Sequence, residues 1–331
     1  MYVIIKKAHC SQRTSSVKFK VFLLFSFLSV SCLASICLAG ITAEDKRKDT
    51  PLIRNLNGAG KWFPSEGKRL KKMVEDFMEN AQCASVKGRI IGAISPHAGY
   101  IYSGKVAGYA FRAIRDNARS LKDPETVVIL GLRHRGIFSG VALMDGDFIE
   151  TPLGPLKLDK EAAQFLCSQS GRIFFDYRPH IGEHSAENEI PFVQAAVPNA
   201  QVVVGIMGDH EEDTIEELVE ALNKLADTKS ILVIASSDMM HAPDYDLVSA
   251  TDRDTLERVK SLDYPSIRKS WNPEKQSFCG IGPVLAVMRF SKRRGCSRGL
   301  VLHYKNSGDY FPSGRGQWVV GYCSVLFVRP E

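Results

Sequence analysis

Short apolar runs alternate with helical patterns along most of this chain. The clearest runs are rich in Val and Ile, and they are Arg89–Ile94, Thr126–Leu130, Gln201–Ile206, Ser230–Ala235 and Gln317–Val328. Continuous apolar runs of this length are typical of strands that are buried on both faces of a sheet. We therefore predict that these five segments are strands.

The segments between the runs repeat apolar residues at intervals of three and four positions, as amphipathic helices do. One predicted face contains Val106, Tyr109, Ala110, Ala113 and Ile114, and another contains Ile215, Leu218, Val219, Leu222 and Leu225. Asp213 and Glu216 have the spacing of a capping box before the second face. Asp159–Ser168 and Thr251–Leu262 are further predicted helices. This alternation predicts a three-layer α/β/α fold with a largely parallel or mixed central sheet.

The N-terminal segment has a different pattern. Basic residues precede an apolar, uncharged run at 21–39, and small residues follow it. This is the pattern of a secretory signal peptide. A run of about 20 residues could also span a bilayer as an uncleaved anchor, or form a buried helix of the fold. We expect export to the periplasm or the extracellular space, or membrane anchoring, through residues 1–43. Residues 44–51 read as a charged tether, and 52–331 as a single domain without internal linkers or repeats.

The charge and the cysteine content argue against a nucleic-acid-binding protein and against a disulfide-rich protein. Five of the 43 lysines and arginines, and none of the 37 acids, lie in residues 1–43, so the formal charge falls from +6 to +1 without them. A nearly neutral body lacks the basic stripe of a nucleic-acid-binding protein. Of the eight cysteines, five lie beyond residue 43, and their odd number and irregular spacing do not indicate a disulfide framework.

Three histidines follow three of the predicted strands. His97 follows Arg89–Ile94, His134 follows Thr126–Leu130, and His241 follows Ser230–Ala235. A single histidine after a strand is usually a hydrogen-bonded loop residue. Because ligands bind beyond the carboxyl ends of parallel strands, however, three such histidines are expected to converge. Neutral imidazole is the commonest ligand of transition metals in proteins.

Two neighbouring features add chemistry to these histidines. Asp238 lies three residues before His241, where its carboxylate could hold the imidazole tautomer or adjust its pKa for proton transfer. Alternatively, Ser237 or Asp238 caps a helix. Cys279 precedes a helical pattern, and a thiol at a helix N-terminus tends toward the metal-binding thiolate. The alternative is a buried, inert cysteine.

Several common motifs are missing from the sequence. It has no phosphate-binding loop, dinucleotide-binding glycine fingerprint, nucleophile elbow or zinc-protease motif. Gly99, Gly104 and Gly108 do not have the dinucleotide spacing and indicate close backbone packing instead.

Six segments occur in the order found in a known family. They are SPHAGYIYSG at 95–104, LGLRHRG at 130–136, EHSAENEIPF at 183–192, IASSDMMH at 234–241, CGIGP at 279–283, and NSGD with VVGY within 306–322. With them, residues 52–328 resemble the Memo family of the AmmeMemoRadiSam group. The resemblance implies a mixed sheet between helices, similar to the fold of class III extradiol dioxygenases. Those enzymes bind ferrous iron with two histidines and a carboxylate, and use another histidine as acid/base.

The resemblance also implies roles for particular residues. The metal ligands would be His97, His134 and Cys279, with His241 and Asp238 as catalytic groups in the same cleft. A thiolate would thus replace the carboxylate of the dioxygenases, which changes the choice of metal. The implied cofactor is a divalent metal, Fe(II) first and Cu or Zn as alternatives. Further residues expected to line the cleft or bind substrate are His184, Glu183, Tyr100, Arg133 and Arg135. The two arginines either select an anionic substrate or face solvent.

Two classes of function follow from the resemblance. The first is a metal-dependent oxidoreductase that acts on a small substrate. The second is a protein that binds a small ligand or a peptide, or carries metal, without turnover. A zinc hydrolase, in which Asp238 or Glu183 activates water, is a further alternative. Genes of this family often accompany a radical-SAM protein and a companion protein, which makes these two expected pathway partners.

Overall fold

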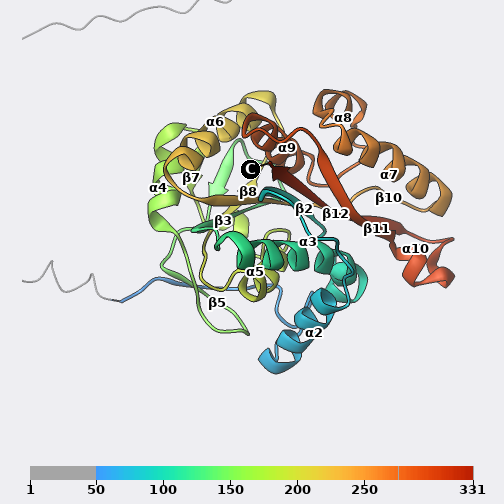
Figure 1. Ribbon diagram of the computed structural model, residues 1–331, viewed down its shortest axis with the longest axis horizontal. Helices are drawn as coiled ribbons and strands as arrows, with labels where there is room; N and C mark the ends of the chain where they lie inside the picture. Colours follow the sequence, from blue (N-terminus) through green and yellow to red (C-terminus); the bar gives the residue numbers. More distant parts are fainter. Residues whose placement is uncertain (1–49, 275, 331) are drawn as a thin grey trace, which may run out of the picture. The chain divides into compact units, whose positions relative to one another are not determined.

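The computed structural model describes residues 50–274 and 276–330 (Figure 1). Pro51–Glu331 forms one compact unit. Residues 1–43, which we interpreted as a signal peptide or anchor, lie outside the described residues, as does most of the charged tether. Within those residues, no helix has both the length and the apolar character needed to cross a membrane.

Four parallel strands form the centre of the main sheet. In spatial order they are β2 (Arg89–Ser95), β9 (Ile231–Ser236), β3 (Thr126–Leu132) and β8 (Gln201–Met207). Each lies within two residues of a predicted run, and nearly all of their residues are buried. The apolar composition of these runs therefore predicted their position in the middle of the sheet.

Antiparallel neighbours make the sheet mixed. β12 (Val319–Arg329), the fifth predicted strand, pairs antiparallel with β2, and both β10 (His241–Ala242) and β11 (Gly299–Asn306) pair with β12. At the other edge, β4 (Val141–Leu143) pairs antiparallel with β8 and parallel with β7 (Ile173–Phe175). A separate small sheet contains β1 (Ile53–Asn55), β5 (Phe148–Glu150) and β6 (Leu156–Lys157).

Helices cover both faces of the main sheet (Figure 1). One core joins the sheet to α4 (Lys160–Gln169), α6 (Glu212–Thr228), α7 (Tyr245–Lys260), α8 (Tyr264–Ser270) and α9 (Ile281–Arg293). The other joins it to α2 (Gly67–Glu79), α3 (Tyr100–Leu121) and α5 (Ile190–Ala196). Short helices complete the fold: η2 (Arg178–His180), η3 (Glu187–Glu189), α10 (Ser307–Tyr310) and η4 (Pro312–Gly314). The predicted three-layer α/β/α architecture is confirmed.

The start of α6 differs from the prediction. The helix begins at Glu212, with Glu211 in the N-cap position and no side-chain cap hydrogen bond. The predicted capping box of Asp213 and Glu216 is therefore wrong. Asp213 lies instead in the first turn, where a carboxylate still interacts favourably with the positive end of the helix dipole. The predicted apolar face of α6 is buried as expected.

Two of the three glycines of the 99–108 segment allow α2 and α3 to approach closely. A Cβ atom on Gly108 would lie 2.5 Å from the carbonyl oxygen of Phe77, and one on Gly104 would lie 2.3 Å from the Phe77 ring. Neither site has room for a larger residue. The predicted role of these two glycines in close packing is confirmed.

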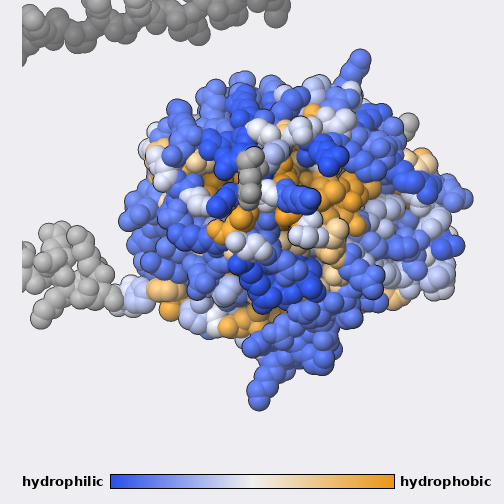
Figure 2. All heavy atoms as spheres, viewed as in Figure 1, coloured by the Kyte–Doolittle hydropathy of each residue, from blue (hydrophilic) through white to orange (hydrophobic). Residues whose placement is uncertain are grey.

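Figure 2 shows that the face seen in Figure 1 is mostly hydrophilic, with apolar atoms gathered near the C-terminal end of the chain. A hollow of about 730 Å³ at this end has a mixed lining, in which the apolar residues include Leu300, Val301, Leu302 and Val328. Val328 lies near the end of β12, whereas His241 pairs with Val320 near its beginning. This hollow is therefore remote from the histidine cluster.

Candidate metal centre

The candidate site lies beyond the carboxyl ends of β2, β9 and β3. His97 lies two residues after β2, and His134 lies two residues after β3. The strand between them, β9, ends at Ser236, which is in register with Ser95 of β2. Neighbouring parallel strands thus place the two imidazoles side by side, with ring centroids 5.2 Å apart. For His97 and His134, the expected convergence at this edge of the sheet is found.

Cys279 completes a group of three candidate ligands. One ligand atom from each of His97, His134 and Cys279 lies within 4.8 Å of the others, and Sγ of Cys279 is 3.4 Å from Nε2 of His97. Bonds of about 2.0–2.3 Å to a zinc-sized ion place ligand atoms roughly 3–4 Å apart. The three residues therefore fit a single metal ion with only small side-chain adjustments.

The loop before α9 positions Cys279 through hydrogen bonds to the segment that follows β9. The backbone N–H of Cys279 donates to the carbonyl oxygen of Asp238, and that of Gly280 donates to Oγ of Ser237. Residues 237–240 form no helix, so neither Ser237 nor Asp238 caps one in its own segment. Ser237 instead accepts the N–H of the N-cap residue of α9.

The thiol of Cys279 does not show the lowered pKa expected at a helix start. Burial raises its pKa to about 12, and the negative charge of Asp238 acts in the same direction. These effects outweigh the helix dipole, which contributes only a partial positive charge. The metal-free site therefore holds a thiol, and metal binding would release its proton.

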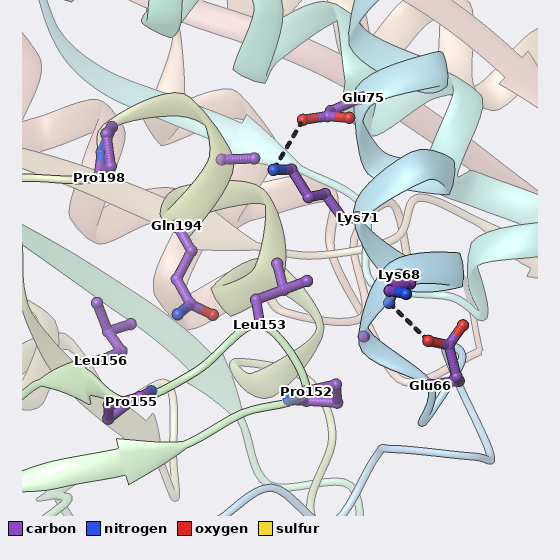
Figure 3. A pocket seen from close by; sticks show the side chains of 12 residues that line it. Glu66, Lys68, Lys71, Glu75, Pro152, Leu153, Pro155, Leu156, Gln194 and Pro198 are labelled. Carbon is purple, nitrogen blue, oxygen red and sulfur yellow. Dashed lines mark hydrogen bonds and ion pairs between the residues drawn. The ribbon is translucent and has the colours of Figure 1, made fainter.

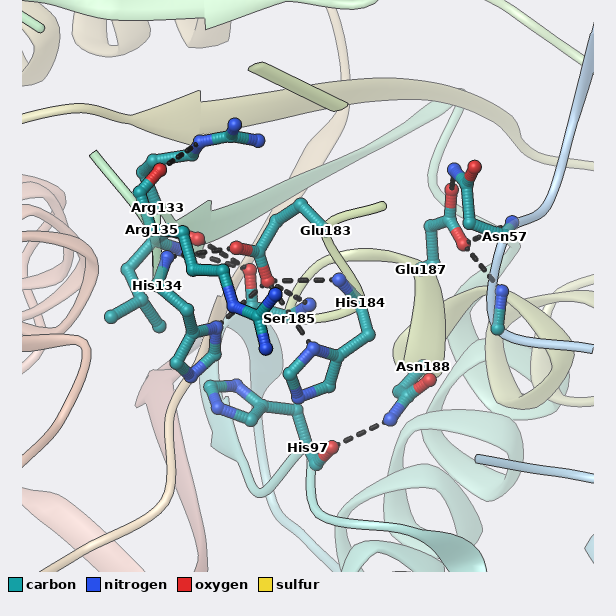
Figure 4. A network of polar contacts seen from close by, with 12 residues as sticks. Asn57, His97, Arg133, His134, Arg135, Glu183, His184, Ser185, Glu187 and Asn188 are labelled. Carbon is teal, nitrogen blue, oxygen red and sulfur yellow. Dashed lines mark hydrogen bonds and ion pairs between the residues drawn. The ribbon is translucent and has the colours of Figure 1, made fainter. Parts of the chain in front are cut away.

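Glu183 fixes the orientation of His134 (Figure 4). Its Oε1 lies 2.8 Å from Nδ1 of His134, and its Oε2 accepts the backbone N–H of the same residue. The N–H groups of His184 and Ser185 also donate to Oε1. Burial alone would raise the pKa of Glu183, but the contacts with His134 hold it well below its usual range. Because Nδ1 faces this carboxylate, Nε2 of His134 is the nitrogen left for a metal.

His184 forms one wall of the centre. Its ring stacks on Trp62 at 3.8 Å and on His134 at 4.6 Å between centroids. Burial lowers the pKa of His184 to about 4, so the ring is neutral at physiological pH. His134, Glu183 and His184 form a second group that is close enough to hold an ion. This second group shares His134 with the first group, and its carboxylate, that of Glu183, is already hydrogen-bonded to His134.

Asp238 does not pair with His241 as the sequence suggested. Its Oδ1 accepts the backbone N–H groups of His97 and Ala98, and its Oδ2 lies 4.0 Å from Nε2 of His97. Burial raises the pKa of Asp238 to about 7. The proposed pairing is wrong because β9 and β2 end side by side, which brings the carboxylate to the start of the 97–99 loop.

His241 lies in the short strand β10, which pairs with β12. It is near enough to His97 and His134 to interact with them electrostatically. Its Nε2 is buried and has no hydrogen-bond partner among the described residues. Burial lowers its pKa to about 4, so the ring is neutral near pH 7. A neutral imidazole with an unpartnered nitrogen can accept a proton or hydrogen bond from a ligand.

The other predicted cleft residues have different environments. Tyr100 is buried in the core, and its hydroxyl donates to the carbonyl oxygen of Asn188. The guanidinium of Arg133 donates to the carbonyl oxygens of Pro179 and Arg135, so it holds the loop together. Arg135 is exposed and is the one of the two arginines available to a ligand.

Four residues around the centre were not predicted from the sequence. Trp62 stacks on His184, Asn188 donates to the carbonyl oxygen of His97, and Ser236 and Glu189 form a buried pair next to the same imidazole. The three buried acids of 183–189 lie just before α5, which begins with apolar residues. Acids so close to an apolar helix start could have indicated from the sequence that they are buried. Nothing in the sequence around Trp62 indicated its contact.

A hollow of about 740 Å³ lies elsewhere, between α2, residues 152–156 and α5 (Figure 3). Lys71 and Glu75 form an ion pair of 3.9 Å on its α2 side. Its lining shares no residue with the histidine cluster. A smaller hollow of about 400 Å³ is lined by Trp62, Gly99 and Tyr102 and borders the centre through Trp62.

The family model for Memo-like proteins matches residues 54–326. The chain belongs to the Memo family. A MEMO1 family protein of Methanopyrus kandleri is 34% identical over 286 residues, which cover 82% of this chain and 97% of the relative. One from Thermoplasma acidophilum is 35% identical over 273 residues, with the same coverage. One from Nitrosopumilus maritimus is 31% identical over 283 residues, covering 84% of this chain and 100% of the relative.

Comparison with solved structures gives a weaker similarity than the sequence matches do. A solved structure of an uncharacterized protein from Escherichia coli K12 aligns with a TM-score of 0.45 and 13% identity, over 72% of this chain and 100% of that one. Membership of the Memo family rests on the sequence matches, and the residues matched by the family model include every segment that carries the candidate metal centre.

Proposed function

We propose that this Memo family protein binds one divalent transition metal, Fe(II) in the first place, and uses it in an oxidoreduction of a small substrate. The ligands would be Nε2 of His97, Nε2 of His134 and Sγ of Cys279. The observation that supports this most is the convergence of three ligand atoms from three separate loops within 4.8 Å. Two neutral imidazoles and one thiolate form a donor set that suits iron, copper or zinc better than magnesium or calcium.

Each proposed ligand has a neighbour that holds it in place. Glu183 binds His134 through both the ring and the backbone, Asp238 binds the backbone of His97, and Ser237 lies 3.6 Å from Sγ of Cys279. Such supporting groups are characteristic of metal sites, because they fix the tautomer and direction of the ligands. A bound metal would supply Lewis-acid and redox chemistry that these side chains lack.

The remaining polar groups are suited to handling protons. His241 is neutral, and its unpartnered Nε2 can accept a proton from a bound substrate. Both oxygens of Glu183 already accept hydrogen bonds from residues 134, 184 and 185, and its pKa lies well below its usual range, so it is too weak a base to suit a zinc hydrolase. His184 and Trp62 form an aromatic wall on the side of His134.

The proposal is tested by metal analysis of the full-length protein purified without oxygen, followed by oxygen-uptake measurements. We expect about one iron per chain, and oxygen consumption that is lost in a His97→Ala, His134→Ala variant. A Glu220→Gln variant, altered at an exposed position on α6, serves as a control. A protein that holds metal without turnover would support the metal-carrying alternative. A protein that takes up no metal at all would exclude both.

A further inference from the structure

Ser236, the last residue of β9, contacts three polar groups at once. Its Oγ lies 2.5 Å from the carbonyl oxygen of Ser185, 2.7 Å from Oε1 of Glu189 and 3.2 Å from Nδ1 of His97. Ser236 and Glu189 are both buried, with Glu189 only 1% exposed. Bulk water therefore cannot take the place of any of these hydrogen-bond partners.

A hydroxyl group has one proton to donate and two lone pairs that accept. The carbonyl oxygen of Ser185 can only accept, and at 2.5 Å it must face the Ser236 proton, because two lone pairs at that distance would repel each other. The two other neighbours must then donate to Oγ. His97 consequently carries its proton on Nδ1, and Glu189 carries one on Oε1.

The burial of Glu189 agrees with a neutral acid in two respects. Its second oxygen, Oε2, is buried and makes no hydrogen bond of normal geometry among the described residues, although the Ser95 hydroxyl is near enough to offset part of the effect of burial on the pKa. An unpartnered buried carboxylate oxygen is far more costly than the carbonyl oxygen of a neutral acid. Burial also raises the pKa of Glu189 to about 8.

The tautomer of His97 determines which nitrogen can bind a metal. With the proton on Nδ1, the lone pair lies on Nε2, which is the atom 3.4 Å from Sγ of Cys279. Asn188 fixes the backbone of His97 by donating to its carbonyl oxygen at 2.6 Å.

We propose that Glu189 is a positioning residue which, as a neutral acid donating to Ser236, fixes His97 in the tautomer whose Nε2 faces the metal. The metal-facing part of this statement rests on the proposed function, whereas the tautomer itself does not. The arrangement differs from that of His134, whose Nδ1 faces the ionised Glu183 directly. The two histidines of the site are thus oriented by acids in opposite protonation states.

The proton positions can be read in the full-length, metal-free protein by long-range ¹H–¹⁵N NMR of the imidazole nitrogens. His97 is assigned from the signals lost in a His97→Gln variant. We expect a protonated Nδ1 and an unprotonated Nε2. A His97 ring protonated on Nε2 would overturn the inference without any substitution at Glu189 being needed.

The role of Glu189 is tested by two variants of similar size. In Glu189→Gln the amide N–H still donates to Ser236, so zinc affinity and the His97 tautomer should stay as in the wild type. In Glu189→Met this donor is lost, and zinc affinity should fall by about 10-fold or more, as for other supporting groups of metal sites. The Nε2–H tautomer of His97 should then become detectable.

A double-mutant cycle with Ser236→Ala separates this role from general packing. Because Glu189 acts through Ser236, Glu189→Met should add little to the loss of zinc affinity in the Ser236→Ala background. Fully additive losses, or a Glu189→Gln variant as weak as Glu189→Met, would overturn the proposal. If the wild type binds neither zinc nor iron, the proposed function fails, but the tautomer measurement still decides the inference about His97.

Discussion

Sγ of Cys279 lies 3.4 Å from Nε2 of His97, although 182 positions separate the two residues in the sequence. One follows β2 and the other precedes α9, and both are held by the segment that follows β9. The contact brings a thiol and an imidazole to the separation of two ligands of one metal ion, roughly 3–4 Å.

Replacement of Cys279 by serine should remove the soft ligand while keeping the size of the side chain. We expect metal affinity to fall by more than the roughly 10–100-fold typical of supporting residues, with little change in the urea midpoint. Equilibrium titration with Zn(II) or Co(II) measures the effect. Cys167→Ala, at a partly buried thiol on α4, is the matched control and should bind metal normally. Normal metal binding by Cys279→Ser would mean that the thiol is only a packing residue.

Replacement of His241 by alanine should leave metal content near that of the wild type. Among the described residues, its buried Nε2 has no hydrogen-bond partner, and it belongs to neither of the two groups close enough to hold an ion. Any turnover found should fall by about 100-fold or more if this residue is the general acid/base. Metal analysis and steady-state kinetics on the same preparation test both parts. A folded variant that has lost its metal would show that His241 is a ligand.

Glu183→Gln should weaken metal binding by about 10–100-fold, because the ring and backbone of His134 both bind this carboxylate. The loss should be largest for metals that need both imidazoles. Glu187→Gln offers a comparison, since that acid binds Asn57 and Gly58 and contacts neither imidazole ligand in the described hydrogen bonds. Equal affinities of the two variants would argue against a supporting role for Glu183.

The two arginines beside His134 should respond differently to replacement by alanine. Arg133 makes charge-assisted hydrogen bonds to Pro179 and Arg135, so Arg133→Ala should lower the free energy of unfolding by about 1–3 kcal/mol. Arg135 is exposed, and Arg135→Ala should change it by less than about 0.5 kcal/mol. Urea unfolding measures both. If Arg135 selects anions, its variant alone should bind inorganic phosphate more weakly at the metal-loaded site.

Asp252 should give the stability of the protein a pH dependence near neutrality. It is buried, it accepts hydrogen bonds from Met240 N–H and the Tyr304 hydroxyl, and burial raises its pKa to about 7. The pKa of an aspartate in the unfolded chain is about 3.9. Between this pH and about pH 7, Asp252 therefore binds more protons in the folded state than in the unfolded state. The contribution of Asp252 to stability is thus complete below about pH 4 and is lost as the pH rises through 7.

Asp252→Asn should flatten this dependence. Relative to the wild type, its unfolding free energy should fall less steeply from pH 4 to pH 7, by up to about 1.4 kcal/mol per pH unit. Urea unfolding of both proteins at several pH values measures the difference between their unfolding free energies. Other titrating groups, such as Glu187, contribute equally to both proteins and cancel in this difference. Parallel curves for the two proteins would contradict the raised pKa of Asp252.

The sequence by itself determined the layers of the fold and the principal residues of the site. Runs of Val and Ile predicted the central strands, because residues buried on both faces of a sheet must be apolar. The positions of His97 and His134 just after two such runs predicted their convergence, since parallel strands present their carboxyl ends at one edge. The motifs around them identified the family.

Only the tertiary structure decided which groups pair within the site. The sequence placed Asp238 beside His241, but the register of β2 with β9 turns that carboxylate toward His97. It left open whether Cys279 is a metal-binding thiolate or a buried, inert thiol, and burial with a nearby carboxylate favours the thiol in the metal-free site. Trp62, Ser236 and Glu189 gained their roles from contacts across distant segments. Local patterns reveal which residues face the interior, whereas hydrogen-bond partners and desolvation depend on segments that meet only when the chain has folded.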